Sequence, residues 1–215
     1  MKTKRLIIGL FVSVVAVGSV VGCATTGYEK AASTATALNR SAEITARGNV
    51  LIDETLSTLN DLVLNPNLDL RKQFKAFNSA VNELGLTARD VTVKDEQMKL
   101  QGAAYFKDWD KEMAMIKNED IRHRSEARKN EVAAQFDRIT QRYDAAKAAF
   151  IPYMSDLRDV QKFLSVDLTS GGLSAIKDVA ARATSHAVPL KDAISKLSVE
   201  FQDLGVSMSS KTAIK

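Results

Sequence analysis

Few side chains in this 215-residue chain have types and spacings suited to chemistry. Cys23 is the only thiol, and His123 and His186 are the only imidazoles. A di-iron site in a helical bundle needs Glu-x-x-His twice, and neither histidine has a glutamate three residues before it. Glu119 lies four residues before His123 and could share a helix face with it, but one such pair is a weak metal signal. We therefore expect no metal, no cofactor and no catalytic residue.

Glycine-rich motifs do not change this expectation. The chain has no Gly-x-Ser-x-Gly nucleophile turn, phosphate loop or dinucleotide fingerprint. Gly171-Gly172 precedes a helical stretch and could cradle an anion at a helix start. It lacks the preceding strand and the lysine of a phosphate loop, so we interpret it as a connection between helices.

The segment before Cys23 has the pattern of a secretory signal. Lys2, Lys4 and Arg5 precede an apolar run that extends to Val21. This run of about 16 residues is shorter than the ~20 needed to cross a bilayer core. A basic segment, a short apolar segment and small residues at the cut are typical of a cleaved signal peptide. We therefore expect residues 1–22 to be removed.

The apolar run ends in Val20-Val21-Gly22-Cys23, which resembles the lipobox of bacterial lipoproteins. The resemblance implies cleavage between Gly22 and Cys23, acylation of the Cys23 thiol with fatty acid such as palmitate, and then acylation of its amine. Residues 23–27 would be the lipidated cysteine and a short linker. Ala24 stands where an aspartate commonly signals inner-membrane retention in this class. The alanine at this position therefore favours the outer membrane, with the protein facing the periplasm.

Cleavage would alter the charge and the redox chemistry of the mature chain. The signal holds three basic residues and no acid, so its removal lowers the formal net charge from +4 to +1. This balance argues against a nucleic-acid partner. The lipid would occupy the only thiol, so we expect no disulfide, and a chain of this length buries a core without one.

Apolar residues recur at spacings of three and four from Tyr28 to Leu204, which is typical of helices that pack along seams. Asn65-Pro66-Asn67 breaks the first run. Asn118 offers a helix cap followed by first-turn acids. The clearest loop is 168–172, where Thr169 or Ser170 would cap the next helix. Two prolines lie inside the last two runs and would kink them, since the spacing continues in phase: Pro152 and Pro189.

These four runs predict one all-α domain over residues 28–205 and a flexible tail at 206–215. The expected architecture is an elongated antiparallel four-helix bundle or coiled coil. The two central helices, nearly 50 residues each, would span ~70 Å, whereas the outer two would span only ~50–55 Å. The unmatched part, roughly Ala104 to Asn130, would project as a two-helix tip at the end of the bundle where the first helix starts.

The tip carries the candidate contact residues for a membrane or a partner. Aromatic side chains favour bilayer interfaces and basic side chains favour lipid phosphates. The candidates are Tyr105, Phe106, Trp109, Arg122 and Arg124. The alternative is that the apolar side chains join the two helices while the charges solvate the outside, and their places on the seam favour this alternative.

Polar residues interrupt the seams at four positions, namely Thr45, Asn49, Asp95 and Glu112. Such residues often fix the register of packed helices. If the chain turns near Asn118, Asp95 lies level with Arg142 and Glu112 lies level with Arg124. We expect ion pairs there rather than catalysis.

The last residue, Lys215, suggests a covalent partner. The murein lipoprotein of didermal bacteria is also helical and lipobox-bearing, and its terminal lysine is joined to peptidoglycan. The similarity here is one residue and a general architecture, so attachment through Lys215 is a minor hypothesis.

A second resemblance rests on four stretches of the mature chain, namely 154–164, 167–173, 73–77 and 104–109. Through these stretches the chain resembles an uncharacterised family of helical bacterial envelope proteins. The resemblance covers about residues 28–205 and implies a helical domain of unknown function, with no catalytic residue to transfer.

Taken together, the sequence predicts a non-enzymatic, lipid-anchored scaffold or adaptor that faces the periplasm. Its partners would be the membrane through Cys23, an envelope protein, or a second copy of the chain. The alternative is a ligand-binding or hydrolytic envelope protein that uses a polar cavity within the bundle.

Overall fold

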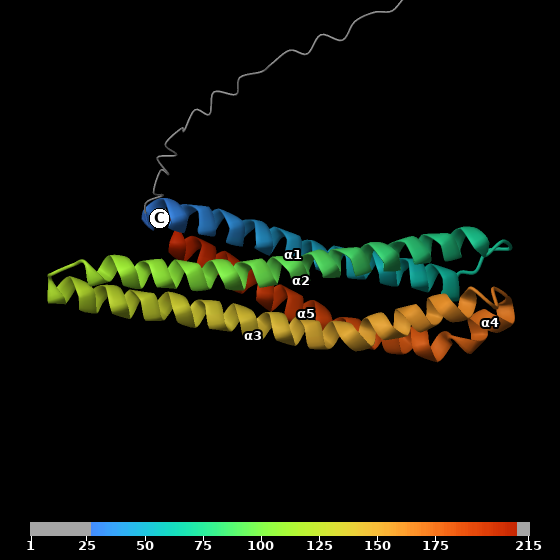
Figure 1. The fold of residues 1–215 in the computed structure, drawn as a ribbon. Coiled ribbons are helices and arrows are strands. Elements are labelled where there is room, and N and C mark those ends of the chain that lie inside the picture. The colour runs from blue at the N-terminus through green and yellow to red at the C-terminus, as the bar shows by residue number, and fades with distance from the viewer. Residues whose placement is uncertain (1–26, 210–215) are drawn as a thin grey trace, which may run out of the picture.

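The computed structural model describes residues 27–209, and every element in that range is a helix (Figure 1). The helices are α1 (Gly27–Leu64), α2 (Arg71–Ala114), α3 (Glu119–Leu164), α4 (Ser170–Ala175) and α5 (Lys177–Met208). The all-α prediction is confirmed. Four of the helices are long, as the seams predict, and the short α4 is an addition.

Each long helix packs on two others. Within the described residues, the backbones of α1 and α3 each run close to those of α2 and α5. α1 and α3 meet through side chains, since Tyr153 donates to the Ile52 backbone oxygen at 3.4 Å. Figure 1 shows the long helices lying lengthwise beside one another. The α2–α3 connection lies at one end, and the α1–α2 connection and α4 lie at the other.

Two apolar clusters form the core, one after the other along the helices. The first core cluster, toward α4, includes the fully buried Phe77, Tyr153 and Leu157. The second core cluster, toward the start of α1 and the end of α5, includes Leu38 and Ile139. Both contain buried residues from α1, α3 and α5, and the first also takes buried residues from α2, such as Phe77.

Gln73, a buried polar residue that the seam pattern does not single out, holds the α1–α2 connection. Its Nε2 donates to the backbone oxygen of Asp61 (3.1 Å), to Asp61 Oδ2 (2.8 Å) and to the backbone oxygen of Asn65 (2.9 Å). Its Oε1 accepts from the Asn67 amide at 2.9 Å. The side chain thus ties the last turn of α1 and the 65–67 connection to the start of α2.

Side-chain caps fix two helix starts. Asn118 accepts from the Ile121 amide at 3.1 Å, which confirms the cap expected there. Thr169 accepts from the Gly172 amide at 3.1 Å, so α4 already begins at Ser170, within the stretch predicted to be a loop. Ile176 then separates α4 from α5.

The last helix is longer than the sequence predicts. The tail was expected from residue 206, but α5 continues to Met208, which is buried in the second core cluster. Gly205 is buried where a Cβ atom would lie 2.5 Å from Asn39 Oδ1, so the absence of a side chain lets α5 approach α1 closely. Packing therefore extends the helix through a segment whose small and polar residues predict fraying.

Several sequence predictions fall outside the described residues. These are the signal at 1–22, the lipidation of Cys23 and the terminal Lys215. Within the described part, no helix has the length and apolar character needed to span a membrane.

Candidate functional site

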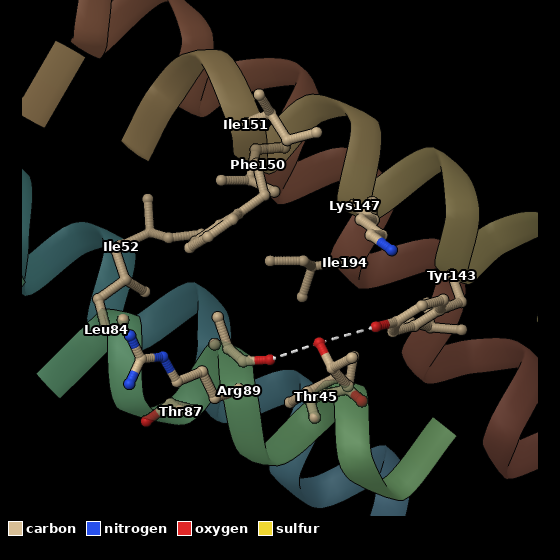
Figure 2. Close-up of a pocket in the computed structure, with 18 of the residues that line it drawn as sticks. Thr45, Ile52, Leu84, Thr87, Arg89, Tyr143, Lys147, Phe150, Ile151 and Ile194 are labelled. Atoms are coloured by element: carbon tan, nitrogen blue, oxygen red, sulfur yellow. Dashed lines mark hydrogen bonds between the residues drawn. The ribbon is translucent and has the colours of Figure 1, made fainter. Parts of the chain in front are cut away.

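An apolar cavity of about 270 Å³ lies between α1, α2, α3 and α5, where the two core clusters meet. Ile52, Leu84 and Leu190 line it from the first cluster, and Tyr143 and Leu197 line it from the second. Figure 2 shows α2 and α3 on opposite sides of the space. The volume is just below the ~300–1,000 Å³ typical of ligand pockets, so the cavity suits a small or slender apolar group.

Small residues on facing helices create this space. Gly48 on α1, Gly85 and Ala88 on α2, and Ala146 on α3 all line the cavity. A Cβ atom on Gly48 would lie 3.6 Å from Ile194 Cδ1, an ordinary van der Waals contact, so the position has room for a side chain. Larger side chains such as that of Phe150 line the same cavity, and the short side chains leave the space between the helices unfilled.

One wall of the cavity has a hydrogen-bonded polar group. Tyr143 donates its hydroxyl to Thr92 Oγ1 at 3.0 Å, and Thr92 donates in turn to the Ala88 backbone oxygen at 3.0 Å (Figure 2). The ammonium of Lys99 lies 5.4 Å from the centre of the Tyr143 ring and 2.8 Å from Asp95 Oδ2. This hydrogen bond to Asp95 raises the pKa of Lys99 above its ordinary value.

Three basic side chains also line the cavity: Arg89 from α2, and Lys147 and Arg158 from α3. All three residues are exposed. None of them forms an ion pair with a carboxylate in the described range 27–209. An acid on the adjacent turn of α2, Glu83, is already paired with Arg47 at 3.5 Å. The cavity thus combines an apolar interior with positive charge that no described carboxylate neutralises.

The polar seam residues are divided between different environments. Thr45 lines the cavity, whereas Asn49 and Asp95 do not. Asn49 donates to Ser195 Oγ at 2.9 Å and so joins α1 to α5. Asp95 Oδ1 accepts no hydrogen bond from a described residue and lines a second, small cavity of about 10 Å³, enough for one water.

The prediction of an ion pair between Asp95 on α2 and Arg142 on α3 is wrong. Asp95 pairs with Lys99 one turn along α2, and Arg142 pairs with Glu200 on α5 at 3.5 Å. The predicted register is nevertheless close, since Thr92 does lie opposite Tyr143. Arg142 is at the predicted level but on the face toward α5, where Glu200 is available.

Glu112 and Arg124 do not form the second expected pair. Within the described residues they are not within ion-pairing distance of each other. Instead, Lys129 and Asp110 join α3 to α2 by an ion pair, and Arg122 pairs with Glu119 on its own helix at 3.5 Å.

The aromatic residues Tyr105, Phe106 and Trp109 pack between α2 and α3 and are half-buried. Trp109 donates its indole N–H to Ser125 Oγ at 2.7 Å and lies edge-on to Tyr105, with centroids 5.5 Å apart. Phe106 lies edge-on to Phe136 of the second core cluster, with ring centroids 5.5 Å apart. Arg122 and Arg124 are exposed. The arrangement favours the interpretation that the aromatics join α2 to α3, while the arginines remain available for contact.

The two histidines lie in unlike surroundings. His123 is exposed near the start of α3. His186 Nδ1 lies 2.9 Å from Oδ2 of the buried Asp156, and Arg182 donates to Asp156 Oδ1 at 2.6 Å, so this cluster joins α3 to α5. No group of three or more potential metal-binding side chains occurs among residues 27–209.

Residues 23–204 match the family model described as "Protein of unknown function (DUF2959)". The chain belongs to the DUF2959 family. This match confirms the expected membership of an uncharacterised family over nearly the predicted range. Comparisons of this DUF2959 protein with curated proteins and with solved structures gave no match.

Proposed function

We propose that this DUF2959 protein is a non-enzymatic, lipid-anchored protein of the bacterial envelope that binds an apolar or amphipathic ligand in its central cavity. The observation that carries the proposal is the apolar space of about 270 Å³ between the two core clusters. A packed interior usually has few voids larger than a water molecule, so a cavity of this size in a helical rod is a candidate binding site.

The lining supports binding rather than hydrolysis. Its described residues include the hydroxyls of Thr45, Thr92 and Tyr143 but neither a carboxylate nor a histidine. Hydrolysis by general-base catalysis needs a proton acceptor beside the attacking hydroxyl or water. Tyr143 instead donates to Thr92, and Thr92 donates to the backbone, so both hydroxyl protons are engaged.

The anchor is part of the same proposal. Support comes from the Val20-Val21-Gly22-Cys23 box and the basic and apolar segments before it. A lipid on Cys23 would keep the cavity close to a membrane, which is a source of apolar and amphipathic molecules. We place the protein at the outer membrane, facing the periplasm, because Ala24 follows the cysteine.

A cavity-filling substitution at Gly48 tests binding. A neutral diazirine-bearing dodecanol, photolysed with membranes that contain the full processed chain, should label peptides of α2 and α3 that line the cavity. Gly48→Leu should lower this labelling at least tenfold, because its side chain occupies the space the probe needs. The fold should persist, since glycine inside a helix costs roughly 0.5–1 kcal/mol relative to alanine.

Gly48→Ala is the matched control, because one methyl group in ordinary contact with Ile194 leaves most of the space open. Labelling should be quantified by mass spectrometry, with a peptide from the start of α2, outside the cavity lining, as the internal reference and helicity checked by circular dichroism. Equal labelling of the Gly48→Leu and Gly48→Ala proteins, both helical, would contradict a ligand site in the cavity.

A second candidate function is that of a scaffold or adaptor acting through the tip. We propose that α1, α2, α3 and α5 form an antiparallel bundle beyond which the α2–α3 tip projects. Arg128 supports this arrangement, since it donates to the Ser207 backbone oxygen at 2.7 Å near the end of α5. In Figure 1 the connected ends of α2 and α3 extend beyond the end of α5. Met115 and Ile121, further along the tip, are 64% and 50% exposed.

In-cell photo-crosslinking tests the tip. A crosslinking amino acid at Ile121 should capture an envelope protein or a lipid, because its apolar side chain is exposed beside Arg122 and Arg124. The matched position is Val199 on α5, which is 53% exposed but distant from the tip. If Ile121 yields no more product than Val199, the tip is not a contact surface.

A further inference from the structure

The central cavity has both apolar and positively charged lining residues, and a purely apolar ligand would contact only the former. Its interior is lined by aliphatic and aromatic side chains, whereas Arg89, Lys147 and Arg158 bring three positive charges to its lining from two helices. In Figure 2, Arg89 extends from α2 and Lys147 from α3 on the two sides of the space. Surface cations on helices are commonly paired with acids one turn away. These three have no carboxylate partner in the described range.

We propose that the cavity takes a single acyl chain that ends in an anionic head group, and that Arg89, Lys147 and Arg158 hold this head group. The inference rests on the proposed ligand-binding function and names the class of ligand. The chain would lie among Ile52, Leu84 and Ile194, and the head group would lie toward the exposed cations.

Three features support a single chain with a negative head. The cavity is slightly smaller than most ligand pockets, which suits one chain rather than two. Its lining offers no described carboxylate that would repel an anion. Guanidinium and ammonium groups form strong, charge-assisted hydrogen bonds with carboxylates and phosphates, so either head group fits the same cations.

Photolabelling with matched probes tests the head group. Membranes containing the full processed chain are titrated with diazirine-bearing dodecanoic acid, dodecyl phosphate or dodecanol, and labelling of the cavity peptides is measured. In the Arg89→Gln/Lys147→Gln variant, the half-saturating concentration of the acidic probes should rise roughly tenfold, because charged hydrogen bonds to the head group are lost. Labelling by dodecanol should stay the same.

The control variant, Lys111→Gln/Lys117→Gln, removes the same charge from the tip at two exposed positions and should leave all three titrations unchanged. Added salt should weaken labelling by the acids more than labelling by dodecanol, since it screens the exposed cations. In the Arg89→Gln/Lys147→Gln variant, a higher half-saturating concentration for dodecanoic acid alone would identify a carboxylate ligand. A higher half-saturating concentration for dodecyl phosphate alone would identify a phosphate ligand.

The failure of this inference is distinguishable from the failure of the proposed function. If dodecanol labels the cavity and Gly48→Leu abolishes that labelling, the site exists. An acid titration that does not shift in the Arg89→Gln/Lys147→Gln variant, or shifts equally in the tip control, then overturns the assignment of an anionic head group alone. If no probe labels the cavity peptides, both proposals are wrong.

Discussion

Replacing Cys23 with alanine is expected to abolish incorporation of an alkyne-tagged palmitate into this protein and to release it from the membrane fraction. The reason is chemical, because acylation in the lipoprotein class requires a thiol and Cys23 is the only one in the chain. The measurement is metabolic labelling, followed by fractionation of the envelope and immunoblotting. Among the expected effects this is the largest, since the label should fall to background.

Thr25→Ala, two residues away, is the matched control and should retain both the label and the membrane association. An acylated Cys23→Ala protein would contradict the lipobox interpretation. An unlabelled variant that still sediments with membranes would show that the protein has a second contact with the envelope, and the exposed tip residues Ile121, Arg122 and Arg124 would be the first candidates.

The helical architecture could be predicted from the sequence because the pattern that encodes it is local. Spacings of three and four identify each seam, and Asn118 caps α3 as its position predicts. The end of α5 could not be predicted in this way. Gly205 and Met208 look like fraying residues in isolation, and only their packing on α1 and the second core cluster keeps them helical.

The cavity could not be predicted, although most of its residues lie on recognised seams. A seam residue is expected to be core, and periodicity does not encode how far apart the helices lie at each level. That distance depends on which residues face each other, and here Gly48, Ala88 and Ala146 line the same level of three helices. Small residues that coincide on facing seams, beside unpaired cations, are the signal that could have identified the site.

The partners of ion pairs are also not encoded in the helical periodicity of the sequence. The hairpin register places Asp95 near the level of Arg142, but the side-chain partner is set by which face of the helix each residue occupies. Asp156, Arg182 and His186 form a cluster between α3 and α5 that neither spacing nor composition indicates. Pairing between non-adjacent parts of the chain requires the packed structure.

Phe77→Ala should lower the free energy of unfolding by about 3–5 kcal/mol, the usual cost of truncating a buried aromatic residue. Phe77 is fully buried in the first core cluster, so its removal leaves a void that neighbours fill only in part. Phe150→Ala is the informative comparison, because this half-buried ring borders the cavity and already lacks neighbours on one side. We expect a smaller loss there, about 1–2 kcal/mol. Urea unfolding followed by far-ultraviolet circular dichroism measures both values. Equal losses would mean that Phe150 is packed as tightly as Phe77 in solution, and a cavity at that position would then be excluded.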